Sequence, residues 1–235
     1  MNKNNKILQE FCGFEEATFN FYKELKANNN KEWFAENKYR YEKIKVISKI
    51  LVSEMRDRFS ALNLPYYADE KKSLFRINRD IRFSSDKSPY KTNLGIYFLF
   101  KPNFMKYNDI SMGLYFHIEE SECFIAGGLH MPDAQALFNV RTYISDNWEE
   151  LEQIINDSNF KKHFPQMYEG EKLKKAPKGF DLNHPAIEIL KQKDFTPLCP
   201  LDKKVALSES IADIILEKGI ILQPFMEYIY RGKNQ

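Results

Sequence analysis

The chain has 235 residues, of which 43% are hydrophobic, 14% aromatic and 29% charged. This composition excludes an intrinsically disordered chain, because disordered chains lack the apolar and aromatic side chains that offset the ordering entropy of folding. The formal net charge is only +2, which argues against a dedicated binder of duplex DNA, because contacts with many phosphates need a clearly basic face.

The first predicted elements are two helices joined by a short turn. Apolar residues from Phe19 to Leu25 recur near helical spacing, and three asparagines at 28–30 follow them. Asparagine side chains favour turns and helix caps. A second helix is expected over about 31–62, because its apolar residues trace one face and no proline or glycine interrupts them. The sequence therefore predicts an N-terminal helical hairpin.

Four runs rich in aromatic and β-branched residues follow, and such runs are typical of strands. They cover residues 74–77, 94–100, 112–118 and 123–126. Their short polar connections suit antiparallel neighbours, so this part of the chain is expected to form an antiparallel sheet.

The C-terminal part is predicted to be mainly helical. Helices are expected over about 132–146, 148–155, 185–191, 203–218 and 222–230. Between them lie a basic loop over 172–180 and an extended, proline-containing segment over 195–200.

Together these elements predict an α+β fold, in which an N-terminal helical hairpin packs on an antiparallel sheet and a mainly helical C-terminal part follows. A chain of 235 residues falls between one large domain and two small ones, and we expect a single domain over 1–235. Within it, the hairpin is expected over 1–68, the sheet over 69–130 and the helical part over 131–235.

Residues 73–92, here called the arginine-rich segment, concentrate fixed charge. Its cations are Arg76, Arg79, Arg82, Lys87 and Lys91. Its two acids, Asp80 and Asp86, leave an excess of five minus two, or three, positive charges. Guanidinium groups bind phosphate or carboxylate through paired hydrogen bonds and keep their charge, so converging arginines commonly hold a dianion. We therefore expect an anion-binding pocket formed by these five cations and Tyr90.

A structural interpretation of the arginine-rich segment stays open. Arg79 with Asp80, and Arg82 with Asp86, can form internal ion pairs that pin an irregular loop. The excess of cations over acids favours a ligand over this scaffold role. The segment lacks the glycine spacing of a P-loop or a dinucleotide fingerprint, so no class of nucleotide is implied.

Four segments of the chain together resemble one protein family. They are residues 28–34, 74–92, 126–132 and 173–185. The chain is similar over nearly its whole length to a mainly bacterial family catalogued as domain of unknown function 2461. That family typically carries a tyrosine between its first two signature arginines, where this chain has Asn78. The resemblance supports one module and implies no activity, because the family has none assigned.

His130 and Asp80 are the candidate catalytic residues. His130 follows Gly127-Gly128, where a backbone bend can aim an imidazole into a pocket, and its titration near neutrality suits proton transfer. A histidine at the surface, or one satisfied by ordinary hydrogen bonds, is the alternative. Asp80 lies among arginines that should lower the pKa of its carboxyl group, so it is better suited to orient them than to act as a base.

No metal site and no other cofactor are predicted. A site built from His117, Cys123 and His130 can be imagined, but alternating strand positions rarely converge on one ion. The other cysteines, Cys12 and Cys199, leave an odd total with wide spacing, which predicts reduced thiols. The sequence contains no signal-peptide pattern and no apolar run of membrane-spanning length.

The sequence predicts a cytoplasmic protein with an anion-binding pocket, and one interpretation is an enzyme that acts on a phosphorylated or carboxylated small molecule. The alternative is a non-enzymatic module that binds a nucleic acid or a protein through basic segments. The second basic segment contains Lys172, Lys174, Lys175 and Lys178. A small anionic ligand is the favoured partner, no membrane partner is expected, and the sequence does not define an oligomeric state.

Overall fold

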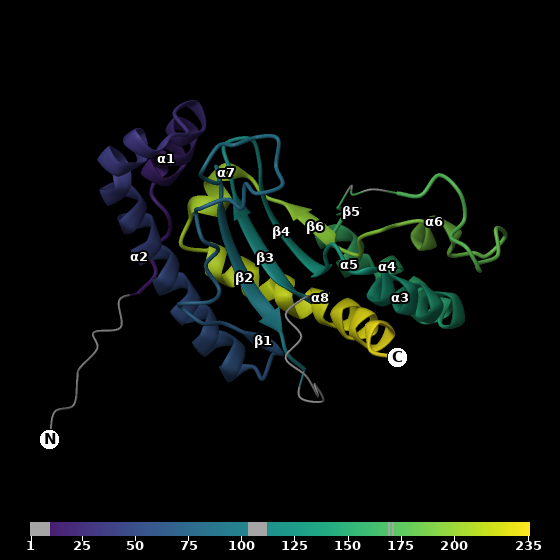
Figure 1. Ribbon diagram of the computed structural model, residues 1–235. Helices are drawn as coiled ribbons and strands as arrows, with labels where there is room; N and C mark the ends of the chain where they lie inside the picture. Colours follow the sequence, from purple (N-terminus) through teal and green to yellow (C-terminus); the bar gives the residue numbers. More distant parts are fainter. Residues whose placement is uncertain (1–9, 103–111, 169, 171) are drawn as a thin grey trace, which may run out of the picture.

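Residues 10–102, 112–168, 170 and 172–235 are described by the computed structural model of the chain, which is shown in Figure 1. Within these residues the helices are α1 (Glu16–Ala27), α2 (Lys31–Ala61), α3 (Ala134–Asp146), α4 (Trp148–Asn156), α5 (Ser158–His163), α6 (Ile187–Leu190), α7 (Lys203–Leu207) and α8 (Ile211–Lys233). The strands are β1 (Tyr66–Tyr67), β2 (Leu94–Phe100), β3 (Met112–Ile118), β4 (Cys123–Leu129), β5 (Gln166–Met167) and β6 (Pro197–Pro200). These elements confirm the predicted α+β fold.

The N-terminal helical hairpin forms where the sequence predicts it. The side chain of Asn30 accepts a hydrogen bond of 2.9 Å from the backbone N–H of Trp33, which caps the start of α2. Both helices pack their apolar faces into the same hydrophobic cluster as the sheet and α8. The turn at 28–30 therefore folds the hairpin back onto the core.

The strands form one antiparallel sheet in the order β1-β2-β3-β4-β6-β5. β2 and β3 have the predicted bounds, and β4 continues to Leu129. The sheet also takes in β1, β5 and β6, which lie outside the segment 69–130 expected for it. The prediction was incomplete because strands of two to four residues carry little periodicity.

The expected strand over 74–77 is wrong. These residues run beside β2, but they form only an isolated bridge between Leu74 and Ile96. A turn interrupts the edge just before them, where the backbone N–H of Ser73 donates to the carbonyl oxygen of Asp69 at 2.8 Å. Phe75, the aromatic residue of 74–77, therefore lies on the sheet without being part of a regular strand.

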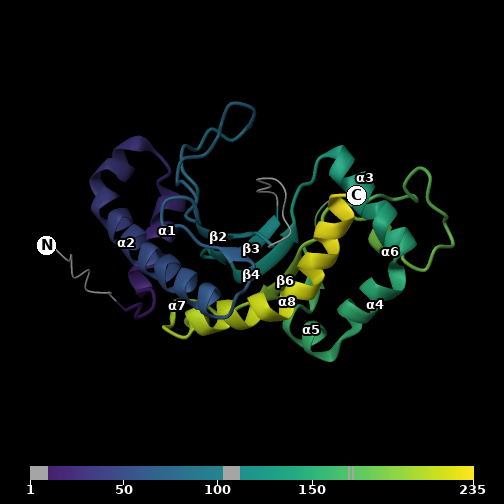
Figure 2. The same cartoon turned by 90° about the horizontal axis from the view of Figure 1, so that it is seen from below.

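The two faces of the sheet have different neighbours. Figure 2 shows α8 along one face and the arginine-rich segment on the opposite side. On the α8 side, a Cβ atom added to Gly127 would lie 2.3 Å from a methyl carbon of Leu222, so α8 approaches the backbone of β4 as closely as glycine permits. The opposite face is the one on which the cavities described below are found.

Helix α8 replaces two expected helices, over 203–218 and 222–230. The structure instead ends α7 at Leu207 and continues α8 from Ile211 to Lys233, with Pro224 inside it. Leu222, which faces β4, and Phe225, whose ring packs on Phe160 of α5, are both buried. The expected break at 219–221 is absent, because burial of this apolar face outweighs the local cost of Gly219 and Pro224 within the helix.

Candidate functional site

The arginine-rich segment forms a narrow loop that projects from the sheet. The N–H of Arg79 donates to the carbonyl oxygen of Pro89 at 2.9 Å, and the N–H of Lys91 donates to that of Ile77 at 2.7 Å. Residues 80–88 form the loop between these two contacts. These backbone hydrogen bonds between its two arms fix the base of the projecting loop, and its tip is exposed.

The two acids of the segment pair with the arginines in the opposite combination to the one expected. Arg82 contacts Asp80 through Nη2–Oδ2 and Nε–Oδ1 distances of 2.6 and 2.9 Å, and Arg79 pairs with Asp86. The hydrogen bonds from Arg82 lower the pKa of the Asp80 carboxyl group. All four side chains retain solvent contact, so these pairs contribute little stability and do not form the buried network that the scaffold interpretation requires.

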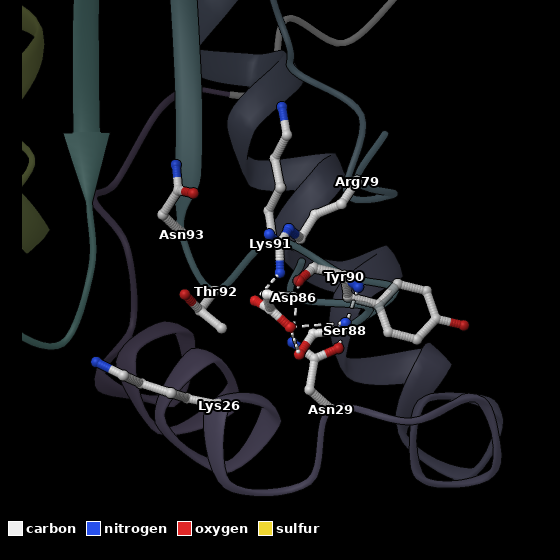
Figure 3. A pocket seen from close by; sticks show the side chains of 9 residues that line it. All are labelled: Lys26, Asn29, Arg79, Asp86, Ser88, Tyr90, Lys91, Thr92 and Asn93. Carbon is white, nitrogen blue, oxygen red and sulfur yellow. Dashed lines mark hydrogen bonds and ion pairs between the residues drawn. The ribbon is translucent and has the colours of Figure 1, made fainter. Parts of the chain in front are cut away.

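A polar hollow of about 400 Å³ lies between the projecting loop and the helical hairpin, and we call it the basic hollow (Figure 3). It is lined by Lys26, Asn29, Arg79, Asp86, Ser88, Tyr90, Lys91, Thr92 and Asn93. Three of the six predicted anion-binding residues are therefore among its walls. The other three, Arg76, Arg82 and Lys87, do not line it, and Lys87 donates to the carbonyl oxygen of Ile81 at 3.0 Å.

The side chains of the basic hollow do not converge on one point. In Figure 3 the ammonium groups of Lys26 and Lys91 point away from Asp86 in different directions, and the ring of Tyr90 points out of the polar cluster. Tyr90 is only 8% exposed, and its ring stacks on Phe34 with centroids 4.2 Å apart. Tyr90 is thus part of the core, and the predicted six-residue pocket is not assembled as one cavity.

Lys91 instead faces the sheet. Its ammonium nitrogen lies 4.9 Å from the ring centroid of Phe75, in a cation–π contact. Burial, and then the charge of Arg76, lower the pKa of Lys91. Arg76 is exposed, and the described residues give its side chain no hydrogen bond or ion pair. Lys91 therefore stands beside the ring of Phe75 without an acidic partner among the described residues, and Arg76 is close enough for its charge to act on Lys91.

A second cavity, of about 350 Å³, lies on the face of the sheet opposite α8, and we call it the aromatic groove. Its walls include the rings of Phe75, Tyr97, Tyr115 and Phe124. Strand register explains this, because Tyr97 pairs with Tyr115, and the neighbouring pair on the same face joins His117 to Phe124. Residues two apart on a strand face the same way, so the aromatic side chains form a continuous surface.

His130 lies at one end of the aromatic groove and is held by Asp194. Its Nδ1 is 2.6 Å from Oδ2 of Asp194, which also accepts the N–H of Met131 at 3.1 Å. The Asp194 side chain is almost fully buried, whereas that of His130 is 53% exposed. The hydrogen bond to Asp194 raises the pKa of His130. This contact fixes the proton on Nδ1 and leaves Nε2 for another partner.

Gly128 allows the chain to bring these two residues together. It has a φ of +146°, and a Cβ atom there would lie 2.0 Å from the carbonyl oxygen of Phe195. Leu129 and Phe195 form a bridge at the same point, which places Asp194 beside His130. The glycine pair was the only sequence signal for this contact. Asp194 itself was missed, because it lies 64 residues away along the chain.

Asp80 is not part of this arrangement, since it lines neither cavity. The groove also has polar groups that the sequence analysis did not select. Thr196 lines it, and its buried Oγ1 has no hydrogen-bond partner among the described residues. Tyr168 meets the ring of His130 edge-on, with centroids 5.3 Å apart. Short strands β5 and β6 position both residues, and these strands had little or no periodic signal.

The other end of the aromatic groove contains His117 and Glu122. Nδ1 of His117 lies 3.0 Å from the hydroxyl of Tyr115, and its ring stacks on Phe124 with centroids 4.5 Å apart. Burial lowers the pKa of His117. The metal set imagined from the sequence, which joined His117 to Cys123 and His130, does not come together in the described part of the chain.

A group that could hold a cation does occur at this end of the groove. One ligand atom from each of His117, Glu119 and Glu122 lies within 4.8 Å of the others. The sequence signal for this group is a histidine two residues before a glutamate, with a second glutamate across a tight turn. The metal set imagined from the sequence shares His117 with this group but contains neither acid.

Comparison with known proteins shows to which family the chain belongs. Among the described residues, none of the helices combines the length and apolarity needed to cross a bilayer. Searches of curated proteins and of solved structures found no match to this chain. One family model does match, over residues 17–228, which covers the hairpin, the sheet and most of α8. The chain therefore belongs to the family described as "conserved hypothetical protein (DUF2461)".

Proposed function

We propose that this protein is a cytoplasmic enzyme that acts on a small phosphorylated or carboxylated molecule bound in the aromatic groove. The observation that carries the proposal is the contact of 2.6 Å between His130 and the buried Asp194 at one end of the groove. A buried carboxylate that orients a partly exposed imidazole is the arrangement by which proteins position a proton donor or acceptor.

The charge at the His130 end of the groove, which lies away from Glu122, favours an anionic ligand. Since Asp194 raises the pKa of His130, the imidazolium form persists to higher pH than in a free histidine, and an imidazolium attracts a phosphate or carboxylate. Lys91 and Arg76 add two cations on the side of Phe75. The free Oγ1 of Thr196 can donate a further hydrogen bond to an anionic oxygen.

The shape of the groove favours a small ligand with a flat or apolar body. Its volume of about 350 Å³ lies in the range of small-molecule sites, about 300 to 1,000 Å³. Aromatic rings line its middle and polar groups lie at its two ends. A molecule with one anionic group would place its body against the rings of Tyr97 and Tyr115 and its charge at an end.

In this scheme His130 acts as a general acid. Its Nδ1 stays with Asp194, and the proton on Nε2 passes to a substrate oxygen on which negative charge develops. The arginine-rich segment contributes Lys91 and Arg76 to the anion, whereas Arg79 and Arg82 are paired with Asp86 and Asp80 and take no part in binding it. Of the six residues expected from the sequence to bind the anion, the site that we propose thus retains only Arg76 and Lys91.

The experiment is an NMR titration of the full chain with phenyl phosphate and benzoate, with phenol as the uncharged comparison. We expect shift changes at His130, Thr196 and the groove tyrosines with the two anions, and much weaker binding of phenol. His130→Gln and Lys91→Met should each weaken phenyl phosphate binding by about tenfold, the usual size of a charged hydrogen bond. Lys87→Met is the matched control, because Lys87 lies in the same segment but lines neither cavity.

Equal binding of phenol and phenyl phosphate would contradict the anion site, and so would an unchanged affinity in both variants. Shift changes confined to Asn29, Thr92 and Asn93 would place the anion in the basic hollow instead. For the catalytic step, release of inorganic phosphate from phenyl phosphate, whose phenoxide leaving group needs a proton donor, is measured in the natural chain and in His130→Gln. Turnover that persists in the variant would rule out His130 as the acid.

A further inference from the structure

The turn that joins β3 to β4 places two carboxylates opposite each other. The backbone N–H of Glu119 donates to the carbonyl oxygen of Glu122 at 2.9 Å, so only Glu120 and Ser121 form the turn. His117 precedes Glu119 by two residues and therefore shares its side of the strand. Three groups able to bind a metal thus gather at one end of the hairpin by local geometry alone.

The two carboxylates are incompletely neutralised. Like charges directly opposite each other destabilise a pair of strands. Lys26 approaches Glu119 at 3.9 Å, and Lys23 pairs with Glu120 in the turn. The carboxylate of Glu122 has no hydrogen bond or ion pair with any described residue. The hairpin end therefore carries negative charge that nearby lysines offset only in part.

The unpartnered Nε2 of His117 is an independent indication that a ligand binds here. The residue is only 8% exposed, and its buried Nε2 has no hydrogen-bond partner among the described residues. An unsatisfied buried polar atom is costly, and it calls for an explanation such as an ion or a water. Nε2 lies among the carboxylate oxygens, 3.6 Å from Oε2 of Glu119.

That distance suits two ligands of one ion better than a direct hydrogen bond. A hydrogen bond between nitrogen and oxygen spans about 2.7 to 3.2 Å. Ligands about 2.0 to 2.2 Å from a tetrahedral ion are separated from each other by about 3.4 Å. The upper limit of 4.8 Å for the whole group is also compatible with a common ion after small side-chain adjustments.

We propose that His117, Glu119 and Glu122 bind one divalent transition-metal ion of the Zn²⁺ or Mn²⁺ class. An imidazole nitrogen with two carboxylates suits these ions, whereas Mg²⁺ and Ca²⁺ prefer oxygen ligands alone. Three protein ligands leave at least one coordination position open. Because His117 and Glu122 line the aromatic groove, that position faces the cavity.

Neighbouring groups hold the ligands in place. The hydroxyl of Thr92 donates to Oε1 of Glu119 at 2.8 Å, which leaves Oε2 directed at His117. The Tyr115 hydroxyl lies 3.0 Å from Nδ1 of His117, and Phe124 stacks on the ring. Partners of this kind orient metal ligands and set the tautomer that leaves Nε2 free to bind. The site needs no substrate, so it does not depend on the proposed function.

The experiment uses the full chain after treatment with EDTA and dialysis. Mn²⁺ is added, and free ion is measured by electron paramagnetic resonance; Zn²⁺ binding is measured by calorimetry. We expect one ion per chain. Glu122→Gln should weaken binding by at least the roughly 10- to 100-fold that loss of an outer-shell partner costs. Glu120→Gln is the matched control, because it removes the same charge from the same turn without removing a ligand.

A second variant tests the buried histidine. His117→Gln should abolish binding, and its circular dichroism shows whether the variant folds. Glu122 is exposed, so Glu122→Gln keeps the test valid if His117→Gln does not fold. Equal weakening by Glu120→Gln and Glu122→Gln would overturn the site in favour of diffuse attraction to an acidic turn. Absence of stoichiometric binding, or Mg²⁺ binding as tight as Mn²⁺ binding, would overturn it as well.

Discussion

At the residue scale, the charge on His130 depends on its contact with Asp194. The carboxylate raises the pKa of His130, whereas its partial burial acts in the opposite direction. In Asp194→Asn the carboxylate is lost and burial remains, so we expect the pKa of His130 to fall below that of the natural chain. Titration of the imidazole carbon-bound protons by NMR measures both values. A His130 pKa at or below its ordinary value in the natural chain would contradict the contact.

The same shift predicts a pH dependence of stability. Because the pKa is raised in the folded state, the folded chain holds the His130 proton more tightly than the unfolded chain does. The stabilising contribution is complete below the ordinary pKa of 6.5, and it is lost as pH rises through the raised value. Urea unfolding across this range should show the decline in the natural chain and a smaller decline in His130→Gln.

Single residues differed in how far their positions could be predicted. His130 was selected because a glycine pair precedes it, and it does line the aromatic groove, just after the positive φ of Gly128 in β4. Asp194 could not be selected, since no local pattern links it to a residue 64 positions earlier. Thr196 could not be selected either, because no local pattern links it to the groove. Side chains that meet through long-range strand pairing leave no periodic signal in either partner.

At the element scale, Asn29 joins the helical hairpin to the arginine-rich segment. Its Nδ2 donates to the carbonyl oxygen of Tyr90 at 2.9 Å, and its Oδ1 accepts the N–H of Tyr90 at 3.0 Å. The side chain thus pairs with the backbone as a neighbouring strand would. We expect Asn29→Ala to lower the free energy of unfolding by about 1 to 3 kcal/mol, because both Tyr90 groups lose their partner.

Amide hydrogen exchange locates that effect. Exchange at Tyr90 should accelerate in Asn29→Ala, while exchange in β3 should change little. Asn28→Ala is the control, because the Asn28 side chain only donates to the exposed carbonyl of Glu24. Unchanged exchange at Tyr90 would show that stacking on Phe34, and not Asn29, holds the segment in place.

Elements were predictable where a strong local pattern agreed with tertiary packing. β2 and β3 combine aromatic and β-branched residues with burial, and α2 has a capping asparagine and an uninterrupted apolar face. The break expected at 219–221, which contains Gly219, was wrong because α8 gains enough contact with the sheet to continue through it. The asparagines at 28–30 indicated a turn, but not the pairing of Asn29 with a residue 61 positions away.

At the scale of the whole molecule, positive and negative charges nearly balance. The chain has 35 lysines and arginines against 33 acids. Three of the nine cations in the two basic segments have acidic partners among the described residues, as Arg79 has Asp86, Arg82 has Asp80 and Lys172 has Glu188. Pairing of this kind could not be predicted from local charge counts. It weakens the case for a polyanion partner relative to a small anion.

The dependence of binding on salt separates these two kinds of partner. A protein that neutralises four phosphates of single-stranded DNA shows a log–log slope of affinity against salt of about −3, because each contact releases a fraction of a counterion. One phosphate at the end of the aromatic groove should give a slope of about −1 or shallower. Titrations of phenyl phosphate and of oligo(dT), repeated at increasing NaCl concentration, measure both slopes. We expect phenyl phosphate to bind with the shallow slope and oligo(dT) to bind more weakly at physiological salt. Tight oligo(dT) binding with a steep slope, reduced by removing lysines of the loop 172–180, would instead favour the nucleic-acid module, because only a surface with several unpaired cations produces that behaviour.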